Sequence, residues 1–132
     1  MHELILLRHA EAVPAEGHGN DHQRPLSEHG RREAQDAGAW LAKHGARPLR
    51  ALCSPARRAE ETAQLALAAL ADPPPLQQAG EIYDATPGEL LALLVEGRSD
   101  EFRGMPPAGL AVLHLNGPLE PASARLDAFW SP

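Results

Sequence analysis

Short runs of consecutive apolar residues alternate along the chain with longer stretches in which apolar residues recur at helical spacing. The run at Glu3–Leu7 ends abruptly in charged residues, which is typical of a strand buried in a parallel sheet. Further strands are predicted at Pro48–Cys53 and Gly109–Leu115. The apolar runs are shorter than the roughly 18 residues that a membrane span requires, so no membrane role is expected.

Helices are predicted where capping residues precede, and helix breakers follow, a stretch with helical periodicity. The first is expected from Glu28 to His44, with Ser27 as its N-cap and Gly45 as its stop. A second is expected to begin at Ser54 and to continue to about Leu70, where a run of prolines follows. A third is expected over Thr86–Glu96.

The alternation of strands and helices predicts an α/β fold, a three-layer sandwich in which helices flank a mostly parallel central sheet. The length of 132 residues suits a single domain over residues 1–132. The polar segment at 13–24 lacks periodicity and is expected to be a surface loop, and the chain ends in a Pro-rich tail from Pro118. Because ligands bind beyond the carboxyl ends of parallel strands, the residues that follow the first two strands are expected to share one edge.

Composition narrows the classes of function further. The formal net charge of -6 has the wrong sign for a protein that binds nucleic-acid phosphates, although a local arginine cluster can still hold one small anion. Cys53 is the only cysteine, so neither an intramolecular disulfide nor a cysteine-based zinc site is expected. The first residues do not resemble a secretory signal, and a cytoplasmic location is expected. We expect neither a metal nor a cofactor.

His9 is the first candidate for chemistry, because it directly follows a predicted strand and has Arg8 beside it. A neutral imidazole can attack phosphorus with one ring nitrogen while a backbone carbonyl holds the other. Arg58 lies just inside the predicted second helix, whose first N–H groups also favour an anion. The plainer interpretation of a histidine after a strand is a structural one, and Arg57 is expected to be a solvated partner of nearby glutamates.

Three motifs resemble successive signatures of the histidine phosphatase superfamily, in the same order. They are Leu7-Arg8-His9-Ala10-Glu11-Ala12, Arg24-Pro25-Leu26-Ser27-Glu28-His29-Gly30-Arg31 and Ser54-Pro55-Ala56-Arg57-Arg58-Ala59-Glu60-Glu61-Thr62-Ala63. The segment Glu81-Ile82-Tyr83-Asp84-Ala85-Thr86-Pro87 resembles the next part of that family. The branch that the chain resembles most is the short bacterial phosphohistidine phosphatases of the SixA type.

The resemblance implies a phosphoglycerate mutase-like fold and a phosphatase in which His9 is the nucleophile that becomes phosphorylated. Arg8 and Arg58 would clamp the phosphoryl group, and Arg24 would be an additional phosphate or substrate contact. The implied substrate is a phosphohistidine-containing protein, with a small phosphorylated compound as the less favoured possibility. No cofactor is implied.

A strong general acid is less necessary for phosphohistidine than for a phosphate ester, because its imidazole leaves readily. If one is used, Glu81 and Asp84 are the candidates that the resemblance implies. A carboxylate near a helix start is more often a cap or a solvated charge, so each also has this ordinary interpretation.

One part of the family pattern is missing. The family carries a second catalytic histidine at the end of a further strand, but here Glu96–Gly104 leads directly into Met105–Leu113, which resembles the family's last strand. The chain is therefore expected to lack one strand–helix unit before its last strand. His114 is expected to be an ordinary sheet residue. The histidines in or beside the loop are not favoured as substitutes either: His18, His22 and His29.

Three interpretations stay open. The chain is a phosphatase that acts through a phosphorylated His9, with activity reduced because the second histidine is not found. Alternatively, it is a catalytically impaired protein that binds phosphoryl ligands through its arginines. In the third, the sequence is incomplete and the whole protein is a complete phosphatase. The oligomeric state is not determined, although a missing strand would leave a sheet edge that invites pairing.

Overall fold

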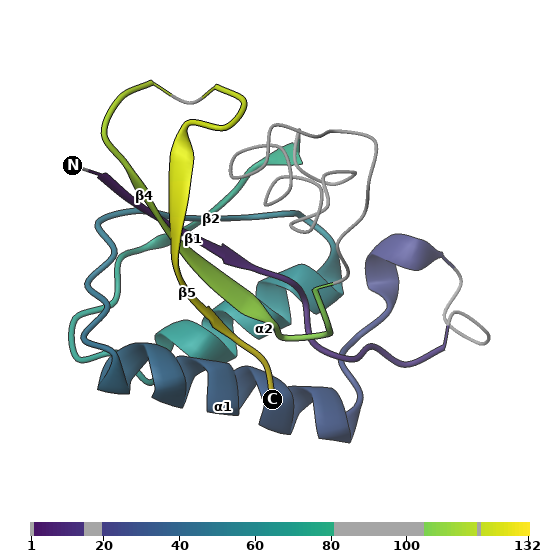
Figure 1. Ribbon diagram of the computed structural model, residues 1–132. Helices are drawn as coiled ribbons and strands as arrows, with labels where there is room; N and C mark the ends of the chain where they lie inside the picture. The colour runs from purple at the N-terminus through teal and green to yellow at the C-terminus, as the bar shows by residue number, and fades with distance from the viewer. Residues whose placement is uncertain (1, 15–19, 81–104, 119) are drawn as a thin grey trace.

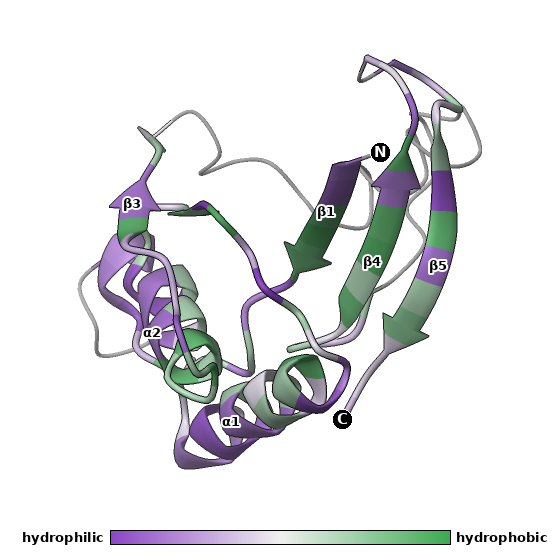
Figure 2. Cartoon of the chain, turned by 90° about the vertical axis from the view of Figure 1, so that its left-hand side faces the viewer, coloured by the Kyte–Doolittle hydropathy of each residue, from purple (hydrophilic) through white to green (hydrophobic). Residues whose placement is uncertain are grey.

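Three strands that lie far apart in the sequence form one antiparallel sheet. The computed structural model describes residues 2–14, 20–80, 105–118 and 120–132 (Figure 1). Within these ranges the strands lie in the order β1-β4-β5, and both neighbouring pairs are antiparallel. Their bounds are β1 (His2–Leu7), β4 (Leu110–Leu115) and β5 (Ala124–Trp130). Figure 2 shows the three strands side by side, with arrows that alternate in direction.

The pairing of β1 corrects the expectation of a parallel strand, because Leu7 lies opposite Leu110 in an antiparallel register. Ile5 and Leu7 pack in an apolar cluster on one face of the sheet. Leu4 and Leu6 pack in a second cluster, on the opposite face. The apolar run of β1 is continuous because side chains pack on both faces of the strand. Burial on both faces does not determine whether a strand is parallel or antiparallel to its neighbour. A mostly parallel central sheet is not confirmed in the described residues.

Parallel pairing occurs instead in a separate two-stranded sheet of β2 (Ala51–Cys53) and β3 (Leu76–Gln78). β2 lies inside the predicted second strand. Neither β3 nor β5 is predicted by the sequence pattern, because both strands are largely exposed and carry polar residues among the apolar ones. Since β5 follows β4, the predicted strand Gly109–Leu115 is not the last strand of the chain.

α1 (Glu28–Lys43) confirms the predicted first helix together with both of its ends. Oγ of Ser27 accepts a hydrogen bond from the N–H of Gly30 at 3.0 Å, as expected of an N-cap. After His44, Gly45 has a φ of 81°, a left-handed conformation that glycine adopts without a Cβ clash. The buried stripe of α1 contains small and aliphatic residues: Gly30, Ala34, Ala37, Gly38 and Leu41.

α2 (Arg57–Leu67) begins later and ends earlier than predicted. The N-cap position belongs to Ala56, and Ser54 lies outside the helix, where its Oγ accepts a hydrogen bond from the N–H of Ala56 at 3.2 Å. α2 packs tightly on α1, since a Cβ on Gly38 would lie 2.5 Å from the carbonyl oxygen of Ala66. Figure 2 shows both helices on the same side of the three-stranded sheet.

The remaining predictions concern the loops and the third helix. The segment 13–24 contains a short 3-10 helix, η1 (Asp21–Gln23), which the sequence pattern does not predict. Two expectations concern residues outside the described ranges: the helix over Thr86–Glu96 and the missing strand–helix unit near it. In the described ranges, we find no helix with the length and apolar character needed to cross a membrane.

Candidate functional site

His9 follows β1 directly, and its ring is oriented by the next peptide. Nδ1 of His9 lies 2.8 Å from the carbonyl oxygen of Ala10. In the neutral ring Nδ1–H donates this hydrogen bond, which leaves the lone pair on Nε2. The N–H of Ala10 donates in turn to Oγ1 of Thr62 at 3.0 Å. The Thr62 hydroxyl donates to the carbonyl oxygen of Arg58 at 2.7 Å, so one buried side chain links the end of β1 to α2.

The turn that leads into β4 holds the backbone on the other side of His9. The N–H of Arg8 donates to the carbonyl oxygen of Gly109 at 3.0 Å, and the N–H of Ala108 donates to that of His9 at 3.2 Å. Nη1 of Arg8 donates to the carbonyl oxygen of Met105. Ala108 has a φ of 60°, a left-handed conformation that costs a residue with a Cβ about 1–2 kcal/mol. This strained turn therefore helps to position Arg8 and His9.

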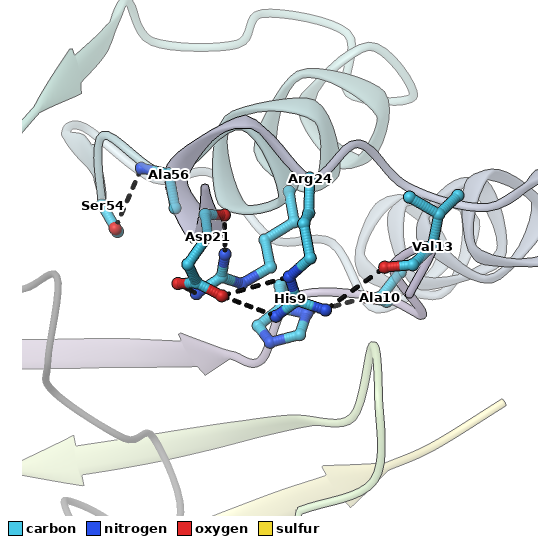
Figure 3. A network of polar contacts seen from close by, with 8 residues as sticks. His9, Ala10, Val13, Asp21, Arg24, Ser54 and Ala56 are labelled. Atoms are coloured by element: carbon cyan, nitrogen blue, oxygen red, sulfur yellow. Dashed lines mark hydrogen bonds and ion pairs between the residues drawn. The ribbon is translucent and has the colours of Figure 1, made fainter. Parts of the chain in front are cut away.

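Asp21 joins two arginines that come from different sequence motifs. Its Oδ2 accepts a hydrogen bond from Nη2 of Arg58 at 2.8 Å, and its carbonyl oxygen accepts one from Nη1 of Arg58, also at 2.8 Å. Oδ1 of Asp21 accepts hydrogen bonds from Nε and Nη2 of Arg24, at 3.1 and 2.9 Å. Nη1 of Arg24 donates to the carbonyl oxygen of Val13 at 3.2 Å. Figure 3 shows Asp21 and Arg24 close to His9, near the end of β1.

The charges of three arginines act on His9. Burial has the largest effect and lowers the pKa of His9 from its ordinary value of 6.5, while the hydrogen bond with Ala10 raises it. The positive charges of Arg58, Arg8 and Arg24 also lower this pKa. The structure therefore places all three predicted phosphate-binding arginines where their charges reach the predicted nucleophile. At neutral pH His9 is an uncharged imidazole among cations, an arrangement that suits attack on an anionic phosphoryl group.

Other residues that the sequence singled out do not join this group. Three of them lie outside the described ranges: Glu81, Asp84 and His18. Nε2 of His114 lies 3.2 Å from Oε2 of Glu3, near the start of β1, whereas His9 follows the end of that strand. His114 is thus the ordinary sheet residue that the sequence predicts. Nε2 of His29 lies 3.6 Å from Oε2 of Glu33 on α1.

Two residues of the site are missed by sequence reasoning. Asp21 lies in an aperiodic polar segment, where a carboxylate is ordinarily solvated, and its only signal is its position three residues before Arg24. Thr62 belongs to the third motif, but its side chain is neither charged nor a predicted nucleophile, so the sequence does not single it out. Its signal is burial, because Thr62 is 2% exposed and a buried hydroxyl needs hydrogen-bond partners.

A surface cavity of about 340 Å³ adjoins η1 and the start of α2. Polar side chains dominate its lining, which consists of His22, Gln23, Pro55, Arg57, Glu60, Glu61 and Gln64. Nε of Arg57 lies 3.4 Å from Oε2 of Glu61 and the side chain is 53% exposed, which confirms the expected solvated ion pair.

Within the described residues, neither Cys53 nor a cluster of metal-ligating side chains forms a second site. Cys53 is buried, and burial raises the pKa of its thiol, which makes the thiolate scarce. Among the residues that the structure describes, we find no group of three or more His, Cys, Asp or Glu side chains that could hold a metal ion.

Known proteins resemble the chain in sequence. The sequence profile of the Histidine phosphatase superfamily (branch 1) matches residues 4–95, which is more than half of the chain. An uncharacterised protein of Mycobacterium tuberculosis (strain CDC 1551 / Oshkosh) is 38% identical over 85 residues, which cover 64% of this chain and 51% of that protein. The chain therefore spans about half the length of the curated relatives that it matches.

Solved structures resemble the chain in fold. The protein histidine phosphatase SixA complexed with tungstate has a TM-score of 0.80 at 20% identity, and the match covers 98% of this chain and 97% of that one. A candidate phosphohistidine phosphatase SixA from Nakamurella multipartitia has a TM-score of 0.64 at 27% identity, and the match covers 98% of this chain and 95% of that one. Because the profile matches residues 4–95, the chain belongs to the histidine phosphatase superfamily.

Proposed function

We propose that this protein is a phosphohistidine phosphatase that acts on a phosphohistidine-containing protein through a phosphorylated His9. The observation that carries the proposal is the geometry at His9, a largely buried neutral imidazole with Nδ1 engaged by Ala10 and three arginine charges around it. A neutral imidazole is a nucleophile, and guanidinium groups suit the oxygens of a phosphoryl group. Nucleophile and anion binding are thus supplied by one group of side chains.

The reaction would take place in two steps. In the first, Nε2 of His9 attacks the phosphorus of phosphohistidine, the bond from phosphorus to the substrate imidazole breaks, and the departing imidazole takes up a proton. In the second, water attacks the phosphorus, the bond to Nε2 breaks, and phosphate leaves. The carbonyl oxygen of Ala10 would hold the ring throughout and would stabilise the positive charge that phosphorylation places on it.

Arg8, Arg24 and Arg58 would bind the phosphoryl oxygens and offset the negative charge of the transition state. Loss of one preorganised group of this kind costs about 10²–10³ in rate. Glu81 and Asp84 stay the candidates for the proton donor to the leaving imidazole. Imidazole is a good leaving group, so this donor contributes less here than it would for an ester.

The fold and the family support a phosphoryl substrate. The similar SixA structure holds tungstate, which is a tetrahedral oxyanion like phosphate. The curated relatives that the chain matches are about twice as long as the matched segment. We therefore propose a substrate that is recognised through its phosphoryl group and the imidazole that carries this group.

The test is phosphoryl transfer from a histidine-phosphorylated peptide. Wild-type protein should release inorganic phosphate and, when quenched early in alkali, carry an acid-labile phosphoryl group. His9→Ala should do neither. His29→Ala, which removes an imidazole that is 60% exposed on α1, should behave as the wild type does. Turnover by His9→Ala at the wild-type rate would contradict the mechanism.

A second function, phosphoryl binding without turnover, is favoured by one observation. The sequence carries no segment that resembles the one bearing the family's second catalytic histidine. This alternative would be established if calorimetry shows binding of inorganic phosphate that is abolished in Arg58→Ala, while the wild-type protein releases no phosphate from the peptide.

The third interpretation, an incomplete sequence, has its own test. The intact mass of the protein from its natural source is compared with 14.1 kDa.

A further inference from the structure

Asp21 contacts both Arg24 and Arg58 in a way that the proposed function does not use. Each carboxylate oxygen serves a different guanidinium, Oδ1 that of Arg24 and Oδ2 that of Arg58. The carbonyl oxygen of Asp21 adds a further contact to Nη1 of Arg58 at 2.8 Å. One residue of η1 therefore sets the spacing between two cations that come from separate parts of the chain.

A carboxylate between two arginines can act in two ways. It can occupy the place of the phosphoryl group and compete with it, or it can hold the guanidinium groups where the phosphoryl group needs them. The charges of Arg24 and Arg58 act on the imidazole while both side chains are bound to Asp21, so the contacts with the carboxylate leave both guanidinium groups within reach of the nucleophile. The binding experiment below separates positioning from competition.

The shape of the guanidinium group makes simultaneous contacts possible. It carries five N–H donors in one rigid plane, so contacts to Asp21 along one edge are compatible with contacts to a phosphoryl group along another. Arg58 is 12% exposed and Arg24 is 23% exposed, whereas Asp21 is 49% exposed. The two guanidinium-bearing side chains are thus more shielded from solvent than the carboxylate that joins them.

We propose that Asp21 is a positioning residue, whose carboxylate holds Arg24 and Arg58 in the orientation that receives the phosphoryl group opposite Nε2 of His9. This role rests on the proposed function. Arginine side chains lose rotamer freedom when they bind a ligand, which weakens binding. Asp21 imposes most of that order before the phosphoryl group arrives, and this gain exceeds the repulsion between its charge and the anion.

Calorimetry with inorganic phosphate tests the role directly. Asp21→Ala should raise the Kd for phosphate about tenfold, because the ligand must then order two arginines itself. Asp21→Asn, which keeps an oxygen acceptor of the same size but no charge, should give an intermediate Kd. Asp36→Ala, a matched change on the exposed face of α1, should leave the Kd unchanged. Thermal unfolding of each variant reports whether it is folded.

Two further measurements distinguish positioning from a general effect on the fold. With the histidine-phosphorylated peptide, Asp21→Ala should raise KM by a larger factor than it lowers kcat. In an Arg24→Ala background the effect of Asp21→Ala on the phosphate Kd should shrink, because only one guanidinium is left to orient. Equal effects of Asp21→Ala in both backgrounds would overturn the role.

The failure of this role and that of the proposed function are distinguishable. Wild-type protein that binds no phosphate would overturn the proposed function, and the Asp21 role with it. Wild-type protein that binds phosphate, together with an Asp21→Ala variant that binds it equally well, would overturn the Asp21 role alone. Tighter binding by Asp21→Ala would show that the carboxylate competes with the anion instead.

Discussion

The N–H of Ala10 donates to Oγ1 of Thr62 at 3.0 Å, which ties the peptide next to His9 to α2. The carbonyl oxygen of the same residue, which belongs to the following peptide, accepts the hydrogen bond from the imidazole at 2.8 Å. Thr62 also donates to the carbonyl oxygen of Arg58. A single hydroxyl thus connects the backbone that orients the predicted nucleophile with the backbone that carries a predicted phosphate-binding arginine.

Thr62→Val keeps the shape of this side chain and removes both hydrogen bonds. We expect the free energy of unfolding to fall by about 1–3 kcal/mol, because the buried N–H of Ala10 loses its acceptor. Phosphoryl transfer should slow as well, since the His9 ring is less firmly held. Thr62→Ser keeps the hydroxyl and should retain most of the activity. Urea unfolding and the peptide assay check both points, and equal rates for the two variants would contradict the orienting role.

Arg58→Ala and Arg57→Ala form a matched pair of neighbours. Removal of Arg58 should lower kcat/KM for the phosphorylated peptide by about 10²–10³, because one cation beside the phosphoryl group is lost. Arg57 is 53% exposed and pairs with Glu61, and an exposed ion pair contributes about 0–1 kcal/mol, so Arg57→Ala should keep nearly wild-type turnover. Comparable losses in the two variants would argue that these arginines act only through the net charge of the surface.

The protonation of His9 gives a third prediction. Burial and the arginine charges lower its pKa, so the imidazole signal in an NMR titration should have its midpoint below 6.5. Saturating inorganic phosphate should move the midpoint upward, because a bound anion favours the imidazolium. Arg58→Ala should also move it upward, since the charge of Arg58 lowers this pKa. A midpoint at or above 6.5 without phosphate would show that His9 is not the buried neutral base described.

The same shift links stability to pH. The unfolded chain has the higher pKa, so between the folded value and 6.5 it binds more protons than the folded protein does. The contribution of His9 to stability is therefore full above 6.5 and is lost as the pH falls toward the folded pKa. The difference in free energy of unfolding between wild type and His9→Ala, measured at several pH values, should follow this dependence. A difference that does not change with pH would be inconsistent with it.

Gly38 allows a test of the helix packing that supports the site. At an exposed position inside a helix, replacement of glycine by alanine stabilises the folded protein by roughly 0.8–1.0 kcal/mol. Here the new Cβ would lie 2.5 Å from the carbonyl oxygen of Ala66, so Gly38→Ala should instead destabilise by about 1–3 kcal/mol. Gly80→Ala, where a Cβ meets nothing within 4 Å, is the control. A Gly38→Ala protein as stable as this control would mean that α1 and α2 can move apart freely.

Several parts of the molecule follow from local sequence. α1 was predictable at both ends, because Ser27 caps it through its own side chain and Gly45 takes a left-handed conformation that few other residues tolerate. His9, Arg8, Arg24 and Arg58 were predictable as one site because their motifs resemble a family in which such residues act together. Local capping needs no knowledge of distant contacts, which is why the prediction of α1 is confirmed. The catalytic and phosphate-binding roles of the four site residues stay predictions.

Strand direction could not be predicted in the same way. The apolar run of β1 reflects cover on both of its faces, and antiparallel β4 supplies the neighbouring strand from more than a hundred residues away. β5 was missed because its exposed residues dilute the apolar signal, and among the described residues it pairs with β4 alone. Pairing partners are chosen by contacts that no local pattern contains.

The sequence by itself determined the identity of the chemical groups at the site, an imidazole and several guanidinium groups carried by recognisable motifs. Only the tertiary structure decided how they are held. Asp21 and Thr62 became part of the site through contacts with residues 37 and 52 positions away in the chain, to Arg58 and Ala10 respectively. A carboxylate in a loop and a hydroxyl on a helix have many possible partners, and the fold selects one by bringing its hydrogen-bonding atoms within reach.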